Sequence, residues 1–222
     1  MSLASASAAR PAPPRRTPKG ERTAERILDA AEALFAEHGY AGTTLRAVAD
    51  RVGVRIPSLY NHFASKDALY AAVLERGLAP VIAVLSDTLE PEGLGSRDSG
   101  ELVERVMAVL AERPELPRLV QHETLTGGQH LTPMLRSWVT PLFARAHDLA
   151  MATPATRRWG PEQIPLLVLA FYHVVVGFFT IAPLLHEWVG EDPRDEAVIE
   201  RQTRFLRQLV ETLLPDEPPA DA

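Results

Sequence analysis

Apolar residues recur at helical spacing along almost the whole chain, and glycine and proline separate one run from the next. Ile27, Ala30, Ala31, Leu34 and Phe35, for example, follow the i, i+3, i+4, i+7, i+8 pattern of a helix with one buried face. No segment alternates apolar and polar residues over a length that predicts a strand. The sequence therefore predicts an all-α fold with about nine helices.

Glycine, proline and capping residues set the expected helix ends. The first helix should end at Gly39, and Thr44 and Ser65 are good N-caps for two later helices. The helix after Ser65 should kink near Gly77 and Pro80. After the first helix, the expected helices span residues 44–52, about 57–63, 66–89, 101–113, 117–125, 132–149, 161–189 and 193–213.

Charge is distributed unevenly along the 222 residues. The net charge of −6 argues weakly against nucleic-acid binding. Residues 1–66, however, carry 10 Lys/Arg and 6 Asp/Glu, a net charge of +4, whereas residues 67–222 carry 13 and 23, a net charge of −10. The partition predicts a basic head on an acidic body. Residues 1–20 and 215–222, rich in proline and polar or small residues, are expected to be a disordered basic arm and a disordered tail.

The basic head contains the spacing of a helix-turn-helix. Ala49 lets two helices approach closely, Gly53 takes the left-handed backbone of the turn, and Leu59 fills the angle between the helices. A tight corner between two purely structural helices needs similar residues, so the spacing alone leaves that alternative open. The next residues favour DNA binding, because Ser58, Tyr60, Asn61 and His62 form a polar, nearly uncharged face.

The stretch GTTLRAVADRVGVRIPSLYNHFASKDALYAAVL resembles the tetracycline-repressor (TetR/AcrR) family of bacterial transcription regulators. The match covers about residues 23–74, and its most specific part is Leu-Tyr-x-His-Phe followed by Ser-Lys at 59–66. The resemblance implies a helix-turn-helix DNA-binding domain over residues 21–66. It also implies a helical ligand-binding and dimerisation domain over residues 67–214, in a cytoplasmic regulator without catalytic activity.

The resemblance also implies which side chains bind double-stranded DNA. Thr44 and Lys66 match positions that hold phosphates, as a helix end and a cation can. Tyr60 and His62 match further phosphate contacts, with packing at the edge of the helix as the alternative.

Four more residues are candidates from their chemistry and position. Ser58 and Asn61 are expected at base edges, and asparagine can bridge N6 and N7 of adenine. Arg46 either contacts DNA or is a solvated surface residue. Arg55 stands where the family commonly has a capping serine, and it is expected to reach a guanine or a phosphate. The arm offers three more cations that either track DNA or only keep the arm soluble: Arg15, Arg16 and Lys19.

An uncharged segment in the body has two interpretations. Residues 164–185 carry no formal charge over 22 residues, which is long enough to cross a bilayer. Pro165, Pro183 and His173 within the segment, and the absence of a flanking Lys/Arg cluster, favour a buried interface helix instead. The resemblance implies a homodimer through the two C-terminal helices, which would match a pseudo-palindromic operator.

Aromatic residues in the body predict a cavity for a small-molecule effector. Trp138, Phe171, His173 and Phe178 are the chosen ligand-binding candidates, with Phe143, Tyr172 and Phe179 as further wall residues. Plain core packing is the alternative for each. The resemblance implies that a small lipophilic effector releases the protein from DNA, so repression relieved by ligand is the expected mode.

Other function classes find little support. The chain has no cysteine, which excludes disulfides, thiolate metal sites and cysteine nucleophiles. His122, Glu123 and His130 invite a metal site, but their spacing matches no zinc motif. No phosphate-binding loop, nucleophile elbow or dinucleotide fingerprint is present. The prediction is therefore no cofactor, no metal and no membrane, with a helical enzyme or metal-binding protein as the alternative.

Overall fold

The computed structural model describes residues 18–88, 99–134, 136–138, 140–141, 144, 159–160 and 162–213. All regular elements among them are helices, which confirms the all-α prediction. They are α1 (Pro18–Gly42), α2 (Leu45–Val52), α3 (Ile56–Tyr60), α4 (Lys66–Thr88), α6 (Ser99–Ala111), α7 (Leu116–Leu125), α9 (Ile164–Thr180), α10 (Ala182–Val189) and α11 (Glu196–Leu213). Residues 131–134, 136–138, 140–141 and 144 are also helical.

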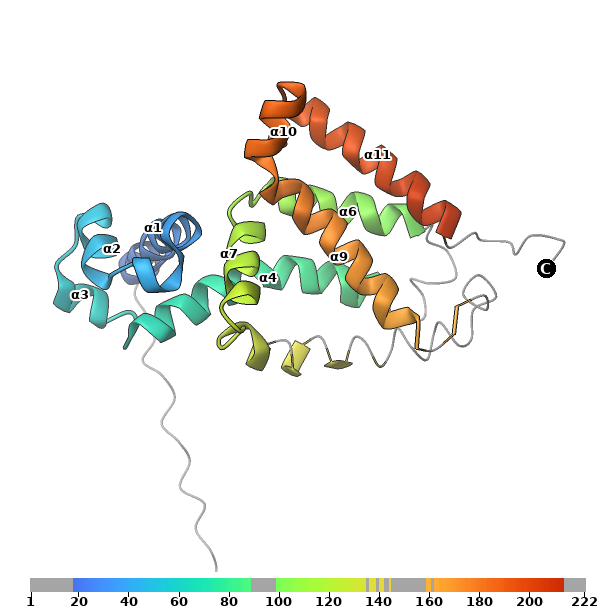
Figure 1. The fold of residues 1–222 in the computed structure, drawn as a ribbon. Coiled ribbons are helices and arrows are strands. Elements are labelled where there is room, and N and C mark those ends of the chain that lie inside the picture. Colours follow the sequence, from blue (N-terminus) through green and yellow to red (C-terminus); the bar gives the residue numbers. More distant parts are fainter. Residues whose placement is uncertain are drawn as a thin grey trace, which may run out of the picture.

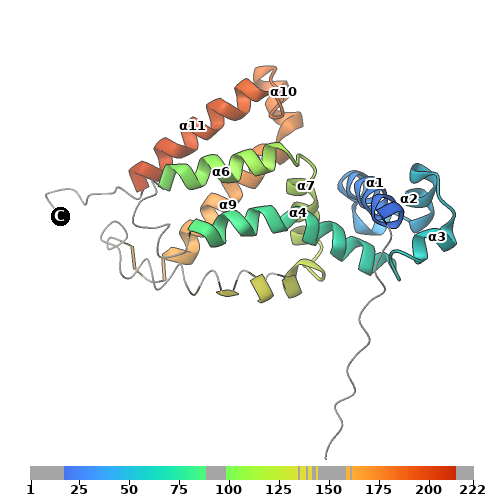
Figure 2. The ribbon, with the colours of Figure 1, turned by 180° about the vertical axis from the view of Figure 1, so that it is seen from behind.

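The helices form a small head and a larger body. In Figure 1, α1, α2 and α3 lie at one end of the molecule, and α4 leads from them into the body. Within the body α6 contacts both α4 and α11, while α7 contacts α1, α4 and α9. Figure 2, seen from behind, shows α9 on the far side of α4 and α6. Because α1 begins at Pro18, residues 18–20 are helical and not part of an arm, and the rest of the expected arm lies outside the described residues.

The expected caps are confirmed. The Thr44 hydroxyl accepts a hydrogen bond from the Ala47 backbone N–H at 3.1 Å and so caps α2. The Ser65 hydroxyl does the same for the Ala68 N–H at 3.0 Å at the start of α4. At Gly39 the backbone turns to φ +69°, so the helical path of α1 is broken there, as expected. Local polar chemistry thus sets these helix ends.

Helix α4 packs against helices of both the head and the body. It runs from Lys66 to Thr88 as one uninterrupted helix that contains Gly77 and Pro80, and the bend expected near this pair stays a prediction. Gly77 has a packing role: a Cβ there would lie 2.7 Å from Cδ1 of Leu116, so a larger residue would force this side chain of α7 to shift. Arg76 pairs with carboxylates of α1, and its Nη1 donates a hydrogen bond to Oδ1 of Asp29 at 2.7 Å. These contacts hold α1, α4 and α7 together.

The helix expected over residues 161–189 is two helices. The Ile181 N–H donates to the Gly177 carbonyl at 2.9 Å and ends α9, after which α10 begins at Ala182. Pro183 explains the break, because its ring has no N–H and would collide with the carbonyl four residues earlier. With its 17 residues α9 is shorter than the about 20 that a bilayer requires. Among the described helices, α4 is long and apolar enough to cross a membrane, but it packs against α1, α6 and α7, as a core helix does.

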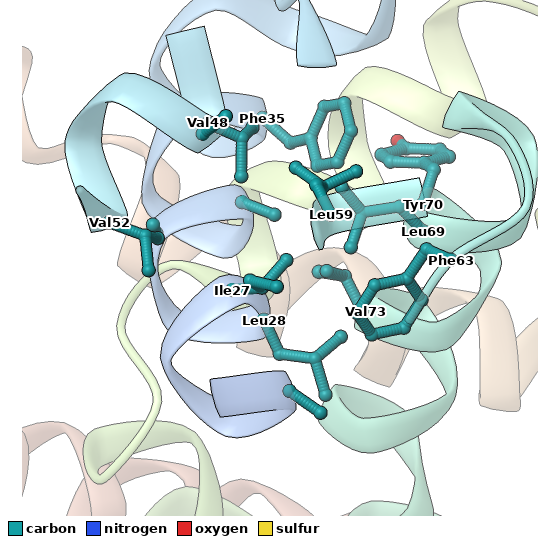
Figure 3. Close-up of a cluster of buried hydrophobic side chains, with 14 of the residues drawn as sticks. Ile27, Leu28, Phe35, Val48, Val52, Leu59, Phe63, Leu69, Tyr70 and Val73 are labelled. Carbon is teal, nitrogen blue, oxygen red and sulfur yellow. The ribbon is translucent and has the colours of Figure 1, made fainter. Parts of the chain in front are cut away.

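The buried side chains form two clusters that meet along α4. The cluster drawn in Figure 3 joins the head to the first half of α4 and to Leu119 of α7. The second cluster fills the body between α6, α7, α9 and α11, with Met107, Leu116 and Leu206 among its most buried members. Leu78 and Val81 of α4 pack against this second cluster. The head therefore rests on elements that also build the body core.

Candidate nucleic-acid interface

The turn between α2 and α3 has the geometry that the spacing predicts. Gly53 adopts φ 75° and ψ 34°, the left-handed region, where side-chain-bearing residues are strained. The next N–H, that of Val54, donates to the Ala49 carbonyl at 3.0 Å and closes the end of α2. Arg26 of α1 donates to the Val52 carbonyl at 2.6 Å. The turn is therefore held by its own backbone and by the first helix.

Buried residues fix the angle between α2 and α3. Val48 and Ala49 of α2 and Leu59 of α3 are fully buried. Figure 3 shows Leu59 among Phe35, Val48 and Leu69. Helix α3 has only five residues: Leu59 is buried and Ile56 packs against the core, whereas Pro57 and Tyr60 are exposed on the outer surface of the head. Helix propensity alone would not hold so short a helix, so packing positions it.

The outer face of α3 carries the predicted DNA contacts. Arg55, Tyr60 and Asn61 are exposed, whereas Ser58 and His62 are partly buried. Arg55 occupies the N-cap position of α3 without a side-chain capping hydrogen bond, as expected from the missing serine. Figure 1 shows α2, α3 and the start of α4 together at the outer end of the head. The face can therefore present donors, acceptors and a cation to a DNA groove.

Thr44 and Arg46 lie at the beginning of α2. Both are exposed, and the Nε of Arg46 is 3.9 Å from Oδ2 of Asp50, a loose surface ion pair that leaves the guanidinium accessible. The structure therefore keeps Arg46 as a candidate for phosphate or base contact. Arg15 and Arg16 lie outside the described residues, and Lys19 lies in α1 without a described side chain.

Lys66 is held at the first turn of α4 by an aromatic ring. Its Nζ lies 4.3 Å from the ring centroid of Tyr40 in α1, a cation–π contact. The Tyr40 hydroxyl donates to Oδ1 of Asp67 at 2.7 Å. Partial burial and this carboxylate raise the pKa of Tyr40 to about 12, so the phenol remains a donor at neutral pH. The ammonium group is thus placed near the N-terminus of α4, where a phosphate is favoured.

Thr44→Ala should lower the free energy of unfolding by about 1 kcal/mol, because it removes the side-chain cap of α2. Thr44→Ser keeps a hydroxyl at the same place and should behave like the wild type. Urea unfolding followed by circular dichroism measures both variants. Equal stability of Thr44→Ala and the wild type would contradict a capping role.

A pocket opens in the body between α4 and the helical residues near 138. Its volume is about 410 Å³, and it is lined by Ala79, Ile82, Ala83, Ser86, Ser137, Trp138 and Pro141. Of the four chosen ligand-binding candidates, Trp138 lines this pocket. The lining is apolar with two hydroxyl groups, which suits an uncharged apolar molecule.

The other candidates do not converge on the pocket. Phe171 and Phe178 pack against the buried body cluster, together with Tyr172 and the buried Phe179. His173 is exposed. Helical geometry explains the separation, because residues 171, 175, 178 and 179 share one face of α9 while residue 173 is about 200° away from 171. Phe143 lies outside the described residues.

The pocket residues of α4 are missing from the sequence prediction. Ala79, Ile82, Ala83 and Ser86 follow i, i+3, i+4, i+7 spacing, which sequence reading assigns to ordinary packing. Their signal is the small size of three of the four side chains, which leaves space against Trp138. In the described part of the chain, no three His, Asp or Glu side chains are grouped so that they could hold a metal ion.

Comparisons with known proteins agree with this geometry. Residues 27–73 match the family described as bacterial regulatory proteins, tetR family. The HTH-type transcriptional regulator RutR of Escherichia coli is 25% identical over 188 residues, which cover 83% of this chain and 86% of RutR. The HTH-type transcriptional repressor KstR2 of Rhodococcus jostii is 32% identical over 139 residues, 58% of this chain and 67% of KstR2.

A solved structure extends the likeness to the whole fold. The transcriptional regulator SCO4942 of Streptomyces coelicolor superposes with a TM-score of 0.64 at 25% identity, over 88% of this chain and 99% of that protein. The relatives are transcriptional regulators and not enzymes. Together with the helix-turn-helix in the head, these matches establish that the chain belongs to the TetR family of DNA-binding transcriptional regulators.

Proposed function

We propose that this protein is a homodimeric repressor that binds a pseudo-palindromic operator and is released from it by a small lipophilic effector. The observation that carries the proposal is the polar outer face of α3, held by the buried Leu59 at the free end of the head. It acts in the bacterial cytoplasm, on the nucleoid when bound to its operator.

Charge supports DNA binding through the head alone. The net charge is +4 over residues 1–66 and −10 over residues 67–222, so the body is repelled by DNA while the head is attracted. Arg55 and Lys66 add cations to a surface whose hydroxyl and amide groups can read base edges. Phosphate contacts then set the register, and Ser58 and Asn61 supply sequence preference.

Exposed apolar side chains support a dimer. Leu166 and Leu169 of α9 are 63% and 51% exposed, and Phe205 of α11 is 55% exposed. Large exposed apolar side chains on the surface of a protein typically mark an interface. We assign this surface, defined as the outer faces of α9 and α11, to the contact between two copies. A twofold dimer presents two α3 helices, which match two half-sites of an operator.

The pocket supports effector control. It lies against the second half of α4, and the first turn of the same helix carries Lys66. A ligand that prefers one position of α4 shifts the population toward the head spacing that goes with it. Release follows when that spacing no longer matches successive major grooves. KstR2, a relative of this chain, is named a repressor, which favours repression as the resting mode.

Selection from random DNA duplexes, repeated with candidate lipophilic ligands, tests the proposal. A pseudo-palindromic site should emerge, and its complex should dissociate with an active ligand. Binding to the selected site that is no tighter than binding to random DNA would refute operator recognition.

Lys66→Ala should weaken binding to the selected operator about tenfold, and it should reduce the slope of log affinity against log salt by about one. Arg136→Ala removes one exposed cation from the body and should leave both quantities unchanged. Fluorescence anisotropy at several salt concentrations measures them. An unchanged salt slope in Lys66→Ala would contradict a phosphate contact.

A further inference from the structure

A polar cluster connects head and body at a place that neither the turn nor the pocket uses. It consists of Tyr40 of α1, Asp67 and Tyr70 of α4, Glu123 of α7, and His130 in the segment after α7. We call it the junction cluster. These five residues come from four separate segments of the chain, so only the tertiary fold brings them together.

The anchor of the junction cluster is a buried carboxylate. Glu123 is 2% exposed. Its Oε2 accepts hydrogen bonds from the backbone N–H groups of His130, at 3.0 Å, and Leu131, at 3.1 Å. Its Oε1 lies 3.2 Å from Nδ1 of His130. A buried carboxyl group is stable only when it is hydrogen-bonded in this way, so the segment around residue 130 is firmly tied to α7.

The second ring nitrogen of His130 reaches the head. Its Nε2 lies 3.0 Å from Oδ1 of Asp67. Both ring nitrogens therefore face carboxylate oxygens, and both can donate only when the ring is the imidazolium cation. The rings of Tyr40 and Tyr70 pack against the imidazole at centroid distances of 4.6 and 4.9 Å. The titratable groups around His130 are thus two phenols and two carboxylates.

From Asp67 the connection continues to the DNA-facing surface. Oδ1 of Asp67 also accepts the hydrogen bond from Tyr40, and the Tyr40 ring lies under the ammonium group of Lys66. One set of contacts therefore runs from the buried carboxylate of α7 to the cation at the start of α4. Hydrogen bonds from His130 and Tyr40 lower the pKa of the Asp67 carboxyl, so this group stays ionised at neutral pH.

We propose that His130 is a positioning residue for DNA binding: as a cation it ties the start of α4 to the body and neutralises Asp67 beside the phosphate-binding Lys66. The inference rests on the proposed operator binding. When the imidazolium loses its proton, one of its two carboxylate bonds is lost and Asp67 repels the nearby phosphates. Operator affinity should then be lower at high pH than at low pH.

The exposure of Asp67 to solvent sets the expected size of the change in operator affinity. The side chain of Asp67 is 69% exposed, so its bond to His130 is screened by water. A pair of this kind changes affinity by about fivefold. His62 is a second imidazole at the predicted DNA surface. The experiment must therefore separate the two histidines.

Operator binding by the full chain at about pH 6 and about pH 8.5 tests the proposal. The wild type should lose about fivefold more affinity between these values than His130→Gln does. His62→Gln should bind more weakly at both values yet retain the difference that His130 causes. Asp67→Asn preserves the acceptor for Tyr40 and the pair of Glu123 with His130, and it should lose that difference as His130→Gln does.

Hydrogen exchange on the free protein gives a reading that does not require DNA. At about pH 6 the first turn of α4 should exchange faster in His130→Gln than in the wild type, and at about pH 8.5 the two proteins should agree. If the exchange difference appears but the wild type binds no operator, the junction stands and the DNA proposal fails. If Asp67→Asn and His130→Gln both keep the wild-type pH dependence and exchange, the role of His130 is refuted.

Discussion

A variant that carries both Leu166→Glu and Leu169→Glu should be monomeric, and its operator affinity should fall at least about a hundredfold. In the protomer these side chains are 63% and 51% exposed, so the change should leave the fold of a single copy intact. In a dimer the same change would place four carboxylates in an apolar interface, where burial of unpaired charge is strongly unfavourable. A single head contacts one half-site only, so affinity depends on the second copy.

Sedimentation velocity gives the oligomeric state, and anisotropy with the selected duplex gives the affinity. Leu125→Glu is the matched control, because Leu125 is apolar and 77% exposed but lies at the end of α7 and does not belong to the surface assigned to the dimer. The control should remain a dimer that binds DNA. If the double variant is still a dimer, the interface lies elsewhere on the body.

Leu59→Ala should lower the free energy of unfolding by about 3 kcal/mol and should also abolish specific operator binding. Leu59 is fully buried between α2, α3 and α4, so truncation leaves a cavity where the angle between the two helices of the motif is set. The side chain does not reach the outer face. Loss of binding would therefore report a loss of positioning and not of a contact.

Chemical denaturation and anisotropy measure the two effects. Leu59→Met conserves volume and should cost less than about 1.5 kcal/mol while it preserves binding. Tyr60→Ala should weaken operator binding with little change in the free energy of unfolding, because Tyr60 is exposed. Normal operator binding by Leu59→Ala would contradict the role of this residue in fixing α3.

The sequence predicts the head better than the body. Thr44, Gly53 and Ser65 act on backbone groups within a few residues, and the structure has each of them in the expected cap or turn. Apolar residues continue through the break at Ile181 and so suggest one helix, although Pro183 indicates an interruption. A proline within an apolar run is stronger evidence for a helix break than the apolar residues around it are for continuity.

The ligand-binding candidates show that residue type and spacing do not determine which side chains line a pocket. Phe171, His173 and Phe178 are aromatic or polar residues at helical spacing, yet α9 directs Phe171 and Phe178 into the body core and His173 to the surface. The pocket instead uses Ala79 and Ser86 of α4 together with Trp138. Small residues form a cavity only when two helices pass beside them at a suitable distance, and sequence spacing does not contain that distance.

By itself, the sequence determined the helical class, the helix-turn-helix and the residues on its outer face, because capping, turn conformation and amphipathic spacing act over a few residues. The tertiary structure alone decided the rest. It packed α7 against α4 at Gly77, opened the pocket beside Trp138, and joined Glu123 and Asp67 through His130. These contacts join residues up to 63 positions apart, and only the packing of the whole core brings them within hydrogen-bond distance.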